Sequence, residues 1–409
     1  MSDLLKNIAN YSTDRISLDE VDLDSYVSTD NLLQNKNGKT SAERLPPKGN
    51  FVTRYDEGDI LIANIRPYLK KIWFATGFGG SSSDVLTIKV KPSYNARFVY
   101  YSLFRDEFFD YVMAGSKGTK MPRGDKSQVL NFPVPSFDIE VQTQIAKVLS
   151  DLDGKIELNN KINAELEAMA KLIYDYWFVQ FDFPDENGKP YKSSGGKMVY
   201  KEELKREIPE GWDNGCLEDI SDIVRGVSYS KSDIKSKDDL DVIPILRATN
   251  ITGNAIDLDN MVYVPSKFVD DKQLLQKFEV LITMSSGSKA HIGKNGLFYF
   301  DELVGFGAFC AKLVAKNYFT FYMYSYMQSD FVSETIRKEC LGTNINNLNG
   351  SLVKGFKLVI PSNSILNSFE NKIKPVYERI MINAKENQKL AELRDWLLPM
   401  LMNGQVTVN

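Results

Sequence analysis

Two long stretches of the chain carry apolar residues at alternating spacings of four and three positions. The first runs from Ile145 to Trp177 and the second from Phe369 to Leu401. A period of about 3.5 residues, kept over about four heptads, is the pattern of helices that pack along a continuous seam. A helix of about 35 to 40 residues is roughly 55 Å long, because each residue adds about 1.5 Å. The pattern therefore predicts two long coiled-coil helices.

These stretches are copies of one pattern placed 224 residues apart, and the similarity extends upstream of them. Residues 59–62 also resemble residues 279–282 at an offset of 220. The features follow the same order in both halves, and each half is a strand-rich globular segment followed by a long helix. The chain is therefore predicted to be an internal duplication. The clearest aligned pairs are Asn159 with Asn383, Asn163 with Asn387, Leu166 with Leu390, Ile145 with Phe369 and Gly118 with Gly342.

Two asparagines lie at the centre of each predicted seam, and they indicate how the helices pair. In an antiparallel arrangement with aligned centres, Asn159 faces Asn387 and Asn163 faces Asn383. A parallel arrangement would also stack the asparagines, but the segment between the halves would then have to span the full helix length. We therefore expect the antiparallel arrangement. Buried asparagines cost stability but fix the register, because a slipped helix would leave their amides unpaired against leucines.

The antiparallel seam has two imperfections. Leu152 would face Arg394, whose charged head is expected to reach out to solvent past its apolar stem. Pro375 removes a backbone hydrogen bond, so a kink or a later start of the second helix is expected there.

Outside the long helices, short runs of β-branched and aromatic residues alternate with turns rich in Gly, Ser and Asn. One helix is expected over residues 95–113, with Phe98, Tyr101, Phe104 and Phe108 on its buried face, and a matching helix over 319–340. A stretch at 182–197, rich in Pro, Gly, Ser and Lys, is predicted to be a flexible connector. The strands are expected at 59–62, 71–75, 85–90, 242–246, 280–284 and 309–314.

The predicted fold class is α+β, with two similar strand-rich domains joined by two long antiparallel coiled-coil helices around a pseudo-twofold axis. The predicted segments are a first domain at 1–136, a central helix at 137–181, a connector at 182–200, a second domain at 201–362 and a C-terminal helix at 363–403.

The composition of the 409 residues is that of a globular protein, with 43% hydrophobic and 25% charged residues. No window approaches the roughly 18 consecutive apolar residues that a membrane span needs, and the first residues resemble neither a signal nor a transit peptide. Three widely spaced cysteines favour free thiols in a reducing cytoplasm. The formal net charge of −4 is unusual for a protein that binds DNA alone, although basic clusters occur at 66–71 and 115–126.

The motifs of several enzyme classes are missing from the sequence. It has neither the Asn/Asp-Pro-Pro-aromatic loop of an amine-directed DNA methyltransferase nor a GxxxxGK[ST] phosphate loop. The single histidine, His291, argues against a His-rich metal site or a His-based triad. A loose nuclease pattern joins Asp185 to Glu203 and Lys205, but the first carboxylate lies in the predicted connector. No catalytic residue, metal or cofactor is therefore expected.

Several short phrases follow one another along the two halves of the repeat. They are GDIL at 58–61 followed by IRP at 65–67, LSDLDGKIELN at 149–159, IPEGW at 208–212, LEDI at 217–220 and PILR at 244–247. With these phrases in this order, the sequence resembles the specificity subunits of type I restriction-modification enzymes over nearly the whole chain. The first half lacks an opening equivalent to PEGW at 209–212, so the first domain is expected to start abruptly or to be trimmed.

The resemblance implies a non-catalytic subunit whose two target-recognition domains each enter the major groove of one half of a bipartite site in double-stranded DNA. It also implies that the helices set the spacing and dock two methyltransferase subunits, and that ATP-driven restriction subunits join the complex. Because the methyltransferase subunits of the family also grip DNA, the resemblance accounts for the acidic net charge.

The candidate DNA-binding residues follow predicted strands or turns at equivalent places of the repeat. Arg bonds guanine in a bidentate way, Asn pairs with adenine, and Lys and Thr more often hold phosphates. The candidates are Arg66, Tyr68, Lys70, Lys117, Thr119, Lys120 and Arg123 in the first domain, and Arg225, Arg247, Ser286, Lys289, His291, Thr343, Asn344 and Asn346 in the second.

Two other interpretations remain open from the sequence. The chain would be a scaffold or an anti-restriction decoy if it bound methyltransferase subunits without reading sequence. It would be a fragment of a self-contained restriction and methylation enzyme if catalytic motifs lay elsewhere, and the missing motifs count against this.

Overall fold

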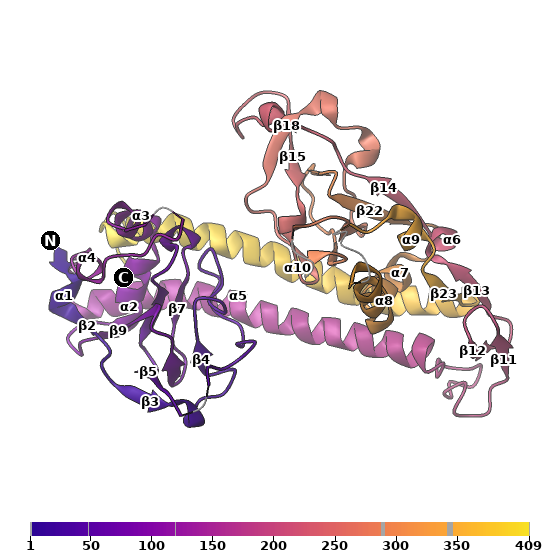
Figure 1. Cartoon of the computed structure of the whole chain (residues 1–409), viewed down its shortest axis with the longest axis horizontal. Helices are drawn as coiled ribbons and strands as arrows, with labels where there is room; N and C mark the ends of the chain where they lie inside the picture. The colour runs from indigo at the N-terminus through magenta and orange to yellow at the C-terminus, as the bar shows by residue number, and fades with distance from the viewer. Residues whose placement is uncertain (1, 48, 119, 288–290, 342–346, 409) are drawn as a thin grey trace. The chain divides into compact units, whose positions relative to one another are not determined.

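The computed structural model describes residues 2–47, 49–118, 120–287, 291–341 and 347–408, with the two long helices α5 (Ile139–Tyr174) and α10 (Asn363–Met402) (Figure 1). A short π-helical turn at Asp175–Val179 follows α5. The chain divides into unit 1, made of Met1–Leu158 and Glu386–Asn409, and unit 2, made of Asn159–Lys385. The division falls within both long helices, so each unit contains one part of α5 and one part of α10.

Unit 1 is built in layers around a sheet with the strand order β2-β9-β6-β7. Successive side chains of β6 point to opposite faces of this sheet and all four are buried, as expected for a central strand. Ile60 and Ile62 pack with α2, α3 and the long helices, whereas Leu61 and Ala63 pack toward a second sheet of order β3-β5-β8-β4. The elements are β1 (Ser2–Leu4), α1 (Leu5–Ile8), β2 (Ala9–Tyr11), β3 (Arg15–Ser17), β4 (Tyr26–Val27), β5 (Phe51–Tyr55), β6 (Ile60–Ala63), β7 (Ile72–Phe74), β8 (Gly79–Ser81), β9 (Val85–Val90), α2 (Ala96–Phe104), α3 (Asp106–Ala114), α4 (Lys126–Val129) and β10 (Pro133–Pro135).

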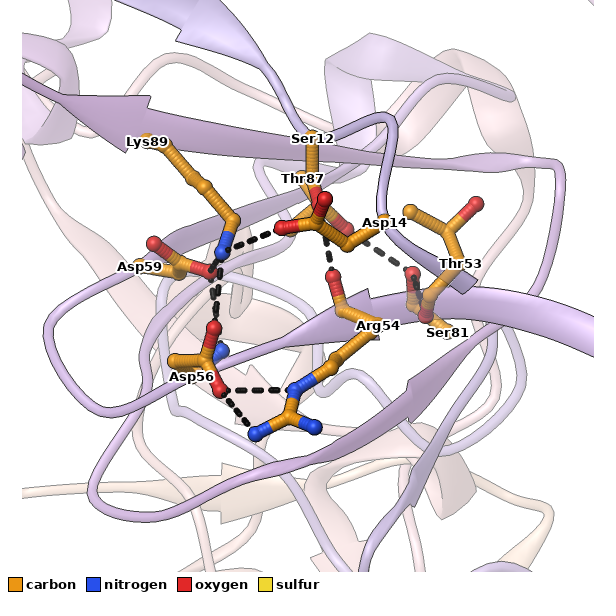
Figure 2. A network of polar contacts seen from close by, with 9 residues as sticks. All are labelled: Ser12, Asp14, Thr53, Arg54, Asp56, Asp59, Ser81, Thr87 and Lys89. Atoms are coloured by element: carbon orange, nitrogen blue, oxygen red, sulfur yellow. Dashed lines mark hydrogen bonds and ion pairs between the residues drawn. The ribbon is translucent and has the colours of Figure 1, made fainter. Parts of the chain in front are cut away.

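A polar network fastens the two sheets of unit 1 to each other (Figure 2). The Lys89 ammonium on β9 pairs with Asp56, just after β5, at 2.7 Å and with Asp14, just before β3, at 3.2 Å. The hydrogen bond from Lys89 holds the pKa of Asp56 below its ordinary value. Deeper in the unit, the buried hydroxyls of Ser81 and Thr87 lie 2.8 Å apart. These contacts fix the second sheet against the sheet whose strands lead to the candidate site.

Unit 2 repeats the central sheet of this topology and part of the second sheet, which here has three strands in the order β18-β15-β21. Its central sheet has the order β14-β22-β19-β20, and β13 pairs with β23 as β1 pairs with β10 in unit 1. Its second sheet keeps the parallel pair, β15 with β21, that β4 and β8 form in unit 1. The remaining elements are β11 (Met198–Lys201), β12 (Arg206–Pro209), β13 (Asp213–Cys216), α6 (Leu217–Ile220), β14 (Ser221–Arg225), β15 (Val242–Leu246), β16 (Ile251–Thr252), β17 (Ala255–Ile256), β18 (Val262–Pro265), β19 (Val280–Thr283), β20 (Asn295–Leu297), β21 (Gly305–Phe306), β22 (Cys310–Ala315), α7 (Thr320–Met327), α8 (Asp330–Leu341), α9 (Gly350–Lys354) and β23 (Lys357–Ile360).

The predicted duplication and α+β fold are therefore confirmed, and so is the antiparallel direction of the helices within each unit. In unit 2 the Asn383 amide donates to the Asn163 side-chain oxygen at 2.8 Å, and the rings of Trp177 and Phe369 are 5.9 Å apart. In unit 1, Ile145 and Leu149 of α5 share a core with Leu398 and Leu401 of α10. The expected pairing of Asn159 with Asn387 crosses the division between the units and stays a prediction.

The two shorter predicted helices are both interrupted. Residues 95–113 form α2 and α3 with an extended residue at Arg105, although the four residues of the predicted apolar face are all buried. Residues 319–340 form α7 and α8, because the Ser329 hydroxyl accepts a hydrogen bond from the Val332 N–H and starts a new helix. Each second helix has acidic residues in its first turn, which complement the positive helix N-terminus.

Two further expectations were wrong, and a third was wrong in part. Helix α10 begins at Asn363, so its start is not delayed to Pro375, whereas the alternative of a kink there stays a prediction. Arg394 does not reach solvent, because it forms an ion pair of 2.8 Å with Asp153 and its side chain is only 15% exposed. The connector is not a free linker, because Phe183 is buried and stacks on Trp212 with ring centroids 4.8 Å apart. In the described part of the chain, no helix is long and apolar enough to cross a membrane.

Glu370 of α10 ties this helix to the start of α7 within unit 2. Its carboxylate accepts hydrogen bonds from the N–H groups of Phe321 and Tyr322 at 2.9 and 2.8 Å. Burial raises the pKa of Glu370 from its ordinary value of 4.5 to about 7. Protonation of this carboxyl therefore stabilises the folded unit, and that contribution is lost as the pH rises toward 7 and above.

The Glu370→Gln variant is expected to lose this pH dependence, because its neutral amide keeps an acceptor oxygen without taking up a proton. Relative to the variant, the wild-type chain should lose about 3 kcal/mol of unfolding free energy between pH 4.5 and pH 8. Urea denaturation at several pH values measures the difference. The exposed Glu378→Gln, on the same helix, is the control. If the unfolding free energies of the wild type and of Glu370→Gln change with pH in the same way, Glu370 is not the source of the pH dependence.

Candidate nucleic-acid interface

The two basic clusters of unit 1 that the sequence singled out lie next to each other in the structure. The first follows β6, and the second lies between α3 and α4. Ile65 forms an antiparallel bridge with Arg123, and the Arg66 N–H donates to the Pro122 carbonyl at 2.7 Å. Lys117 and Arg123 exchange backbone hydrogen bonds of 3.0 Å and close a small hairpin. One surface of unit 1 therefore presents both clusters.

The side chains of this surface are exposed or held by single carboxylates. Arg66 has a left-handed backbone (φ 51°) at the start of the turn Pro67–Leu69, and Tyr68 in that turn is exposed. Lys70 pairs with Asp106 at 2.9 Å. Lys117 is 86% exposed, with Asp125 at 3.7 Å, and Lys120 is exposed as well.

Arg123 is held in a defined orientation by one carboxylate. Its guanidinium lies 2.9 Å from the Asp84 carboxylate while more than half of the side chain remains exposed. The backbone under this pair is fixed, because the Asn64 N–H donates to the Asp84 carbonyl at 2.8 Å and the Gly124 N–H donates to the Asn64 carbonyl at 3.0 Å. A guanidinium held on one side by a carboxylate presents its remaining N–H groups in a defined direction.

Unit 2 repeats this backbone arrangement with different side chains. The Met284 N–H donates to the Phe309 carbonyl at 2.8 Å, and the Leu348 N–H donates to the Met284 carbonyl at 2.7 Å. Ser285 forms an antiparallel bridge with Asn347, as Ile65 does with Arg123. The equivalent of the Asp84 and Arg123 pair in unit 2 is therefore Phe309 and Asn347.

The predicted DNA-binding residues of unit 2 differ in their exposure and in the hollows that they line, and four of them lie outside the described residues. Arg225 is exposed, and Arg247 donates from its guanidinium to the Asn260 carbonyl at 2.7 Å. Ser286 and Arg247 line one hollow of about 430 Å³, and Arg225 lines another of about 680 Å³. Burial and the nearby Lys294 lower the pKa of His291, so its partly buried ring is neutral at pH 7. Thr119, Lys289, Thr343, Asn344 and Asn346 lie outside the described residues.

Sequence reasoning missed Asp84, Phe309 and Asn347. Phe309 was placed inside the predicted strand 309–314, but β22 begins at Cys310, and Phe309 is 67% exposed in the turn before it. The available signal was the repeat, because Asp84 precedes β9 as Phe309 precedes β22. Among the described residues, no group of three or more His, Cys, Asp and Glu side chains is placed to hold a metal ion.

Comparison with known proteins decides the family. The model of the type I restriction modification DNA specificity domain matches this chain twice, at residues 8–168 and 209–392. The chain belongs to this family. Each match covers most of one copy of the repeat and extends into the long helix that follows it.

Individual specificity subunits resemble the chain over most of its length. It is 25% identical to the MjaIX specificity subunit of Methanocaldococcus jannaschii over 317 residues, which are 76% of this chain and 69% of that protein. It is 24% identical to the HindI specificity subunit of Haemophilus influenzae, over 86% of this chain and 87% of that protein. The fold matches the crystal structure of the S subunit from M. genitalium with a TM-score of 0.54 at 15% identity, over 98% and 95% of the two chains. The chain is thus a DNA-binding specificity subunit of a type I restriction system.

Proposed function

We propose that each unit of this specificity subunit reads one half of a bipartite sequence in double-stranded DNA. The repeated backbone frame carries this proposal. The end of β6 with the segment before α4, and the end of β19 with the segment before α9, present side chains in the same way on both units. Asp84 and Arg123 of unit 1 are replaced by Phe309 and Asn347 in unit 2, and a different side chain recognises a different base edge. Two similar frames with different side chains suit a sequence with two unlike halves.

The long helices are proposed to set the spacing between the half-sites and to dock two methyltransferase subunits. Both α5 and α10 contribute to both units, and the asparagine pair Asn163 and Asn383 selects one register in unit 2. We assign Asn159 and Asn387 the same role. Any slip of this register would leave an amide facing a leucine.

Exposed apolar residues on the long helices support the docking proposal. Six of them form three pairs 224 residues apart, so this part of the surface is repeated once on each helix. Met169 and Leu172 of α5 lie in unit 2, and their equivalents Leu393 and Trp396 of α10 lie in unit 1. Exposed apolar side chains that cluster on a helix face mark interaction sites. Two copies of one such face suit two copies of one partner. A third pair is Leu158 and Ile382.

The chain is proposed to contribute recognition and assembly but no covalent chemistry. In this proposal the methyltransferase subunits modify adenine, and ATP-dependent restriction subunits join the same complex. With a net charge of −4 the chain leaves much of the phosphate contact to these partners, since basic surface supplies the salt-dependent part of DNA affinity.

Substitution of the unit 1 cations tests the reading proposal. Arg66→Ala and Arg123→Ala are each expected to reduce methylation by the assembled complex about tenfold or more at the wild-type sequence, because a good bidentate contact discriminates by about 1–3 kcal/mol. Methylation-site mapping and initial rates measure this, and co-purification checks assembly. Lys189→Ala, at an exposed position of the 182–197 segment, is the control. An unchanged site preference in both variants would overturn the assignment of these residues.

A further inference from the structure

Phe309 and Asn347 occupy in unit 2 the places that Asp84 and Arg123 occupy in unit 1. The correspondence rests on backbone hydrogen bonds. The carbonyl of residue 84 accepts from the N–H of Asn64, and the carbonyl of residue 309 accepts from the N–H of Met284, both at 2.8 Å. Arg123 forms an antiparallel backbone bridge with Ile65, and Asn347 forms one with Ser285. A charged pair in one copy of the repeat is thus replaced by an aromatic ring and an amide in the other.

The backbone that carries Phe309 is held firmly, although its ring is exposed. Its carbonyl accepts from both the Met284 and the Ser285 N–H groups, at 2.8 and 3.1 Å. In the preceding turn, Gly307 donates to the Leu246 carbonyl and Ala308 donates to the Val227 carbonyl, at 2.8 and 2.9 Å. A large apolar side chain on a fixed turn, next to small residues, is positioned for contact with something other than its own chain.

The surroundings of Phe309 favour a polyanion with flat, polar edges. Phe309 lines two hollows. Arg225 and Asn347 line the larger hollow together with Glu339, and Arg247 lines the smaller one. The two arginines outnumber the single carboxylate around these hollows, and the Asn347 amide offers a donor and an acceptor. This combination matches the major-groove face of a base pair flanked by phosphates.

We infer that Phe309 and Asn347 together read one A·T base pair in the second half-site, whereas Arg123, oriented by Asp84, reads a G·C pair at the equivalent place in the first. An Asn amide pairs with the N6 and N7 edge of adenine, and an apolar ring contacts the methyl group of thymine in the same base pair. An Arg guanidinium meets the two acceptors of guanine. This inference rests on the proposed bipartite reading and adds the base class at one position of each half-site.

The test uses the full chain assembled with its methyltransferase subunits and maps the methylated sites by sequencing. Phe309→Ala and Asn347→Ala are each expected to weaken the base preference at one position of the second half-site, and this position should be the same for both variants. Methylation of sequences with another base pair there should rise about tenfold to a hundredfold relative to the original sequence. Phe309→Leu, which keeps an apolar contact, should restore most of the discrimination. Phe331→Ala is the matched control, because Phe331 is an exposed ring of unit 2 on α8.

The outcomes separate the inference from the function on which it rests. If the wild-type complex methylates no defined bipartite sequence, the proposed function fails. If it does so but both alanine variants keep every position of the motif, the function stands and the inference is overturned. The inference is also overturned if the relaxed position is a G·C pair, if the two variants relax different positions, or if the change falls in the first half-site.

Discussion

A complex assembled with the Trp396→Glu variant is expected to hold one methyltransferase subunit, whereas two are proposed to bind the wild-type chain. Trp396 lies exposed on α10 in unit 1, and its repeat equivalent on α5 in unit 2 is Leu172, which is exposed as well. Large apolar side chains at the centre of an interface contribute about 2–4 kcal/mol each, so a buried carboxylate there should weaken that site by about 30-fold to 1000-fold. The other copy of the surface is unaltered. Native mass spectrometry of the assembled complex counts the subunits.

The repeat provides the matched variants for this experiment. Leu172→Glu should also leave one methyltransferase subunit, and the double variant should leave none. Leu240→Glu changes the most exposed leucine among the described residues, which is not part of the long helices, and should leave both subunits in place. Because Trp396 and Leu172 are exposed in the free chain, the melting temperature should not change. Two bound subunits in the double variant would show that the partner docks elsewhere.

The duplication and the helix register were predictable because they depend on residue spacing alone. The alternating spacing identifies the seam, and the asparagines at its centre fix which residues meet. The antiparallel alignment of the helix centres that places Asn163 opposite Asn383 also places Trp177 opposite Phe369, and both pairs are in contact. Such patterns are carried by many residues, so a single deviation such as Pro375 does not obscure them.

The candidate site was less predictable because it depends on where strands end and which loops meet. The sequence indicated the two basic clusters of unit 1, but only the folded chain brings Ile65 against Arg123. Phe309 was hidden by its neighbours, since a β-prone residue just before a β-prone strand has the same pattern as the strand itself. The break between α7 and α8 was also hidden, because one capping serine decides it between two stretches that are both helical.

The Arg394→Met variant is expected to lower the stability of unit 1 by about 3 kcal/mol. The spacing argument placed Arg394 opposite Leu152 and predicted that it would reach solvent. Instead its guanidinium is 2.8 Å from Asp153 and stacks over Phe104 at 4.8 Å from the ring centroid. Asp153 also accepts a hydrogen bond of 2.7 Å from the Tyr101 hydroxyl. Removal of one partner of a mostly buried ion pair leaves the other charge uncompensated, which costs about 3–5 kcal/mol.

A double variant separates the cost of the lone charge from the loss of packing. Asp153→Leu combined with Arg394→Met removes both charges and keeps apolar volume, so it should regain most of the lost stability, since hydrophobic replacement of a whole buried pair is often neutral. Hydrogen exchange of peptides from α2 and α3 during urea denaturation reports on unit 1 directly, and peptides from α7 and α8 serve as the internal control. If Arg394→Met leaves the exchange of both sets unchanged, the pair contributes nothing to unit 1. If the double variant is less stable than the single variant, the lone Asp153 charge is not the source of the effect, and the loss of the Arg394 guanidinium from the face of Phe104 accounts for it instead.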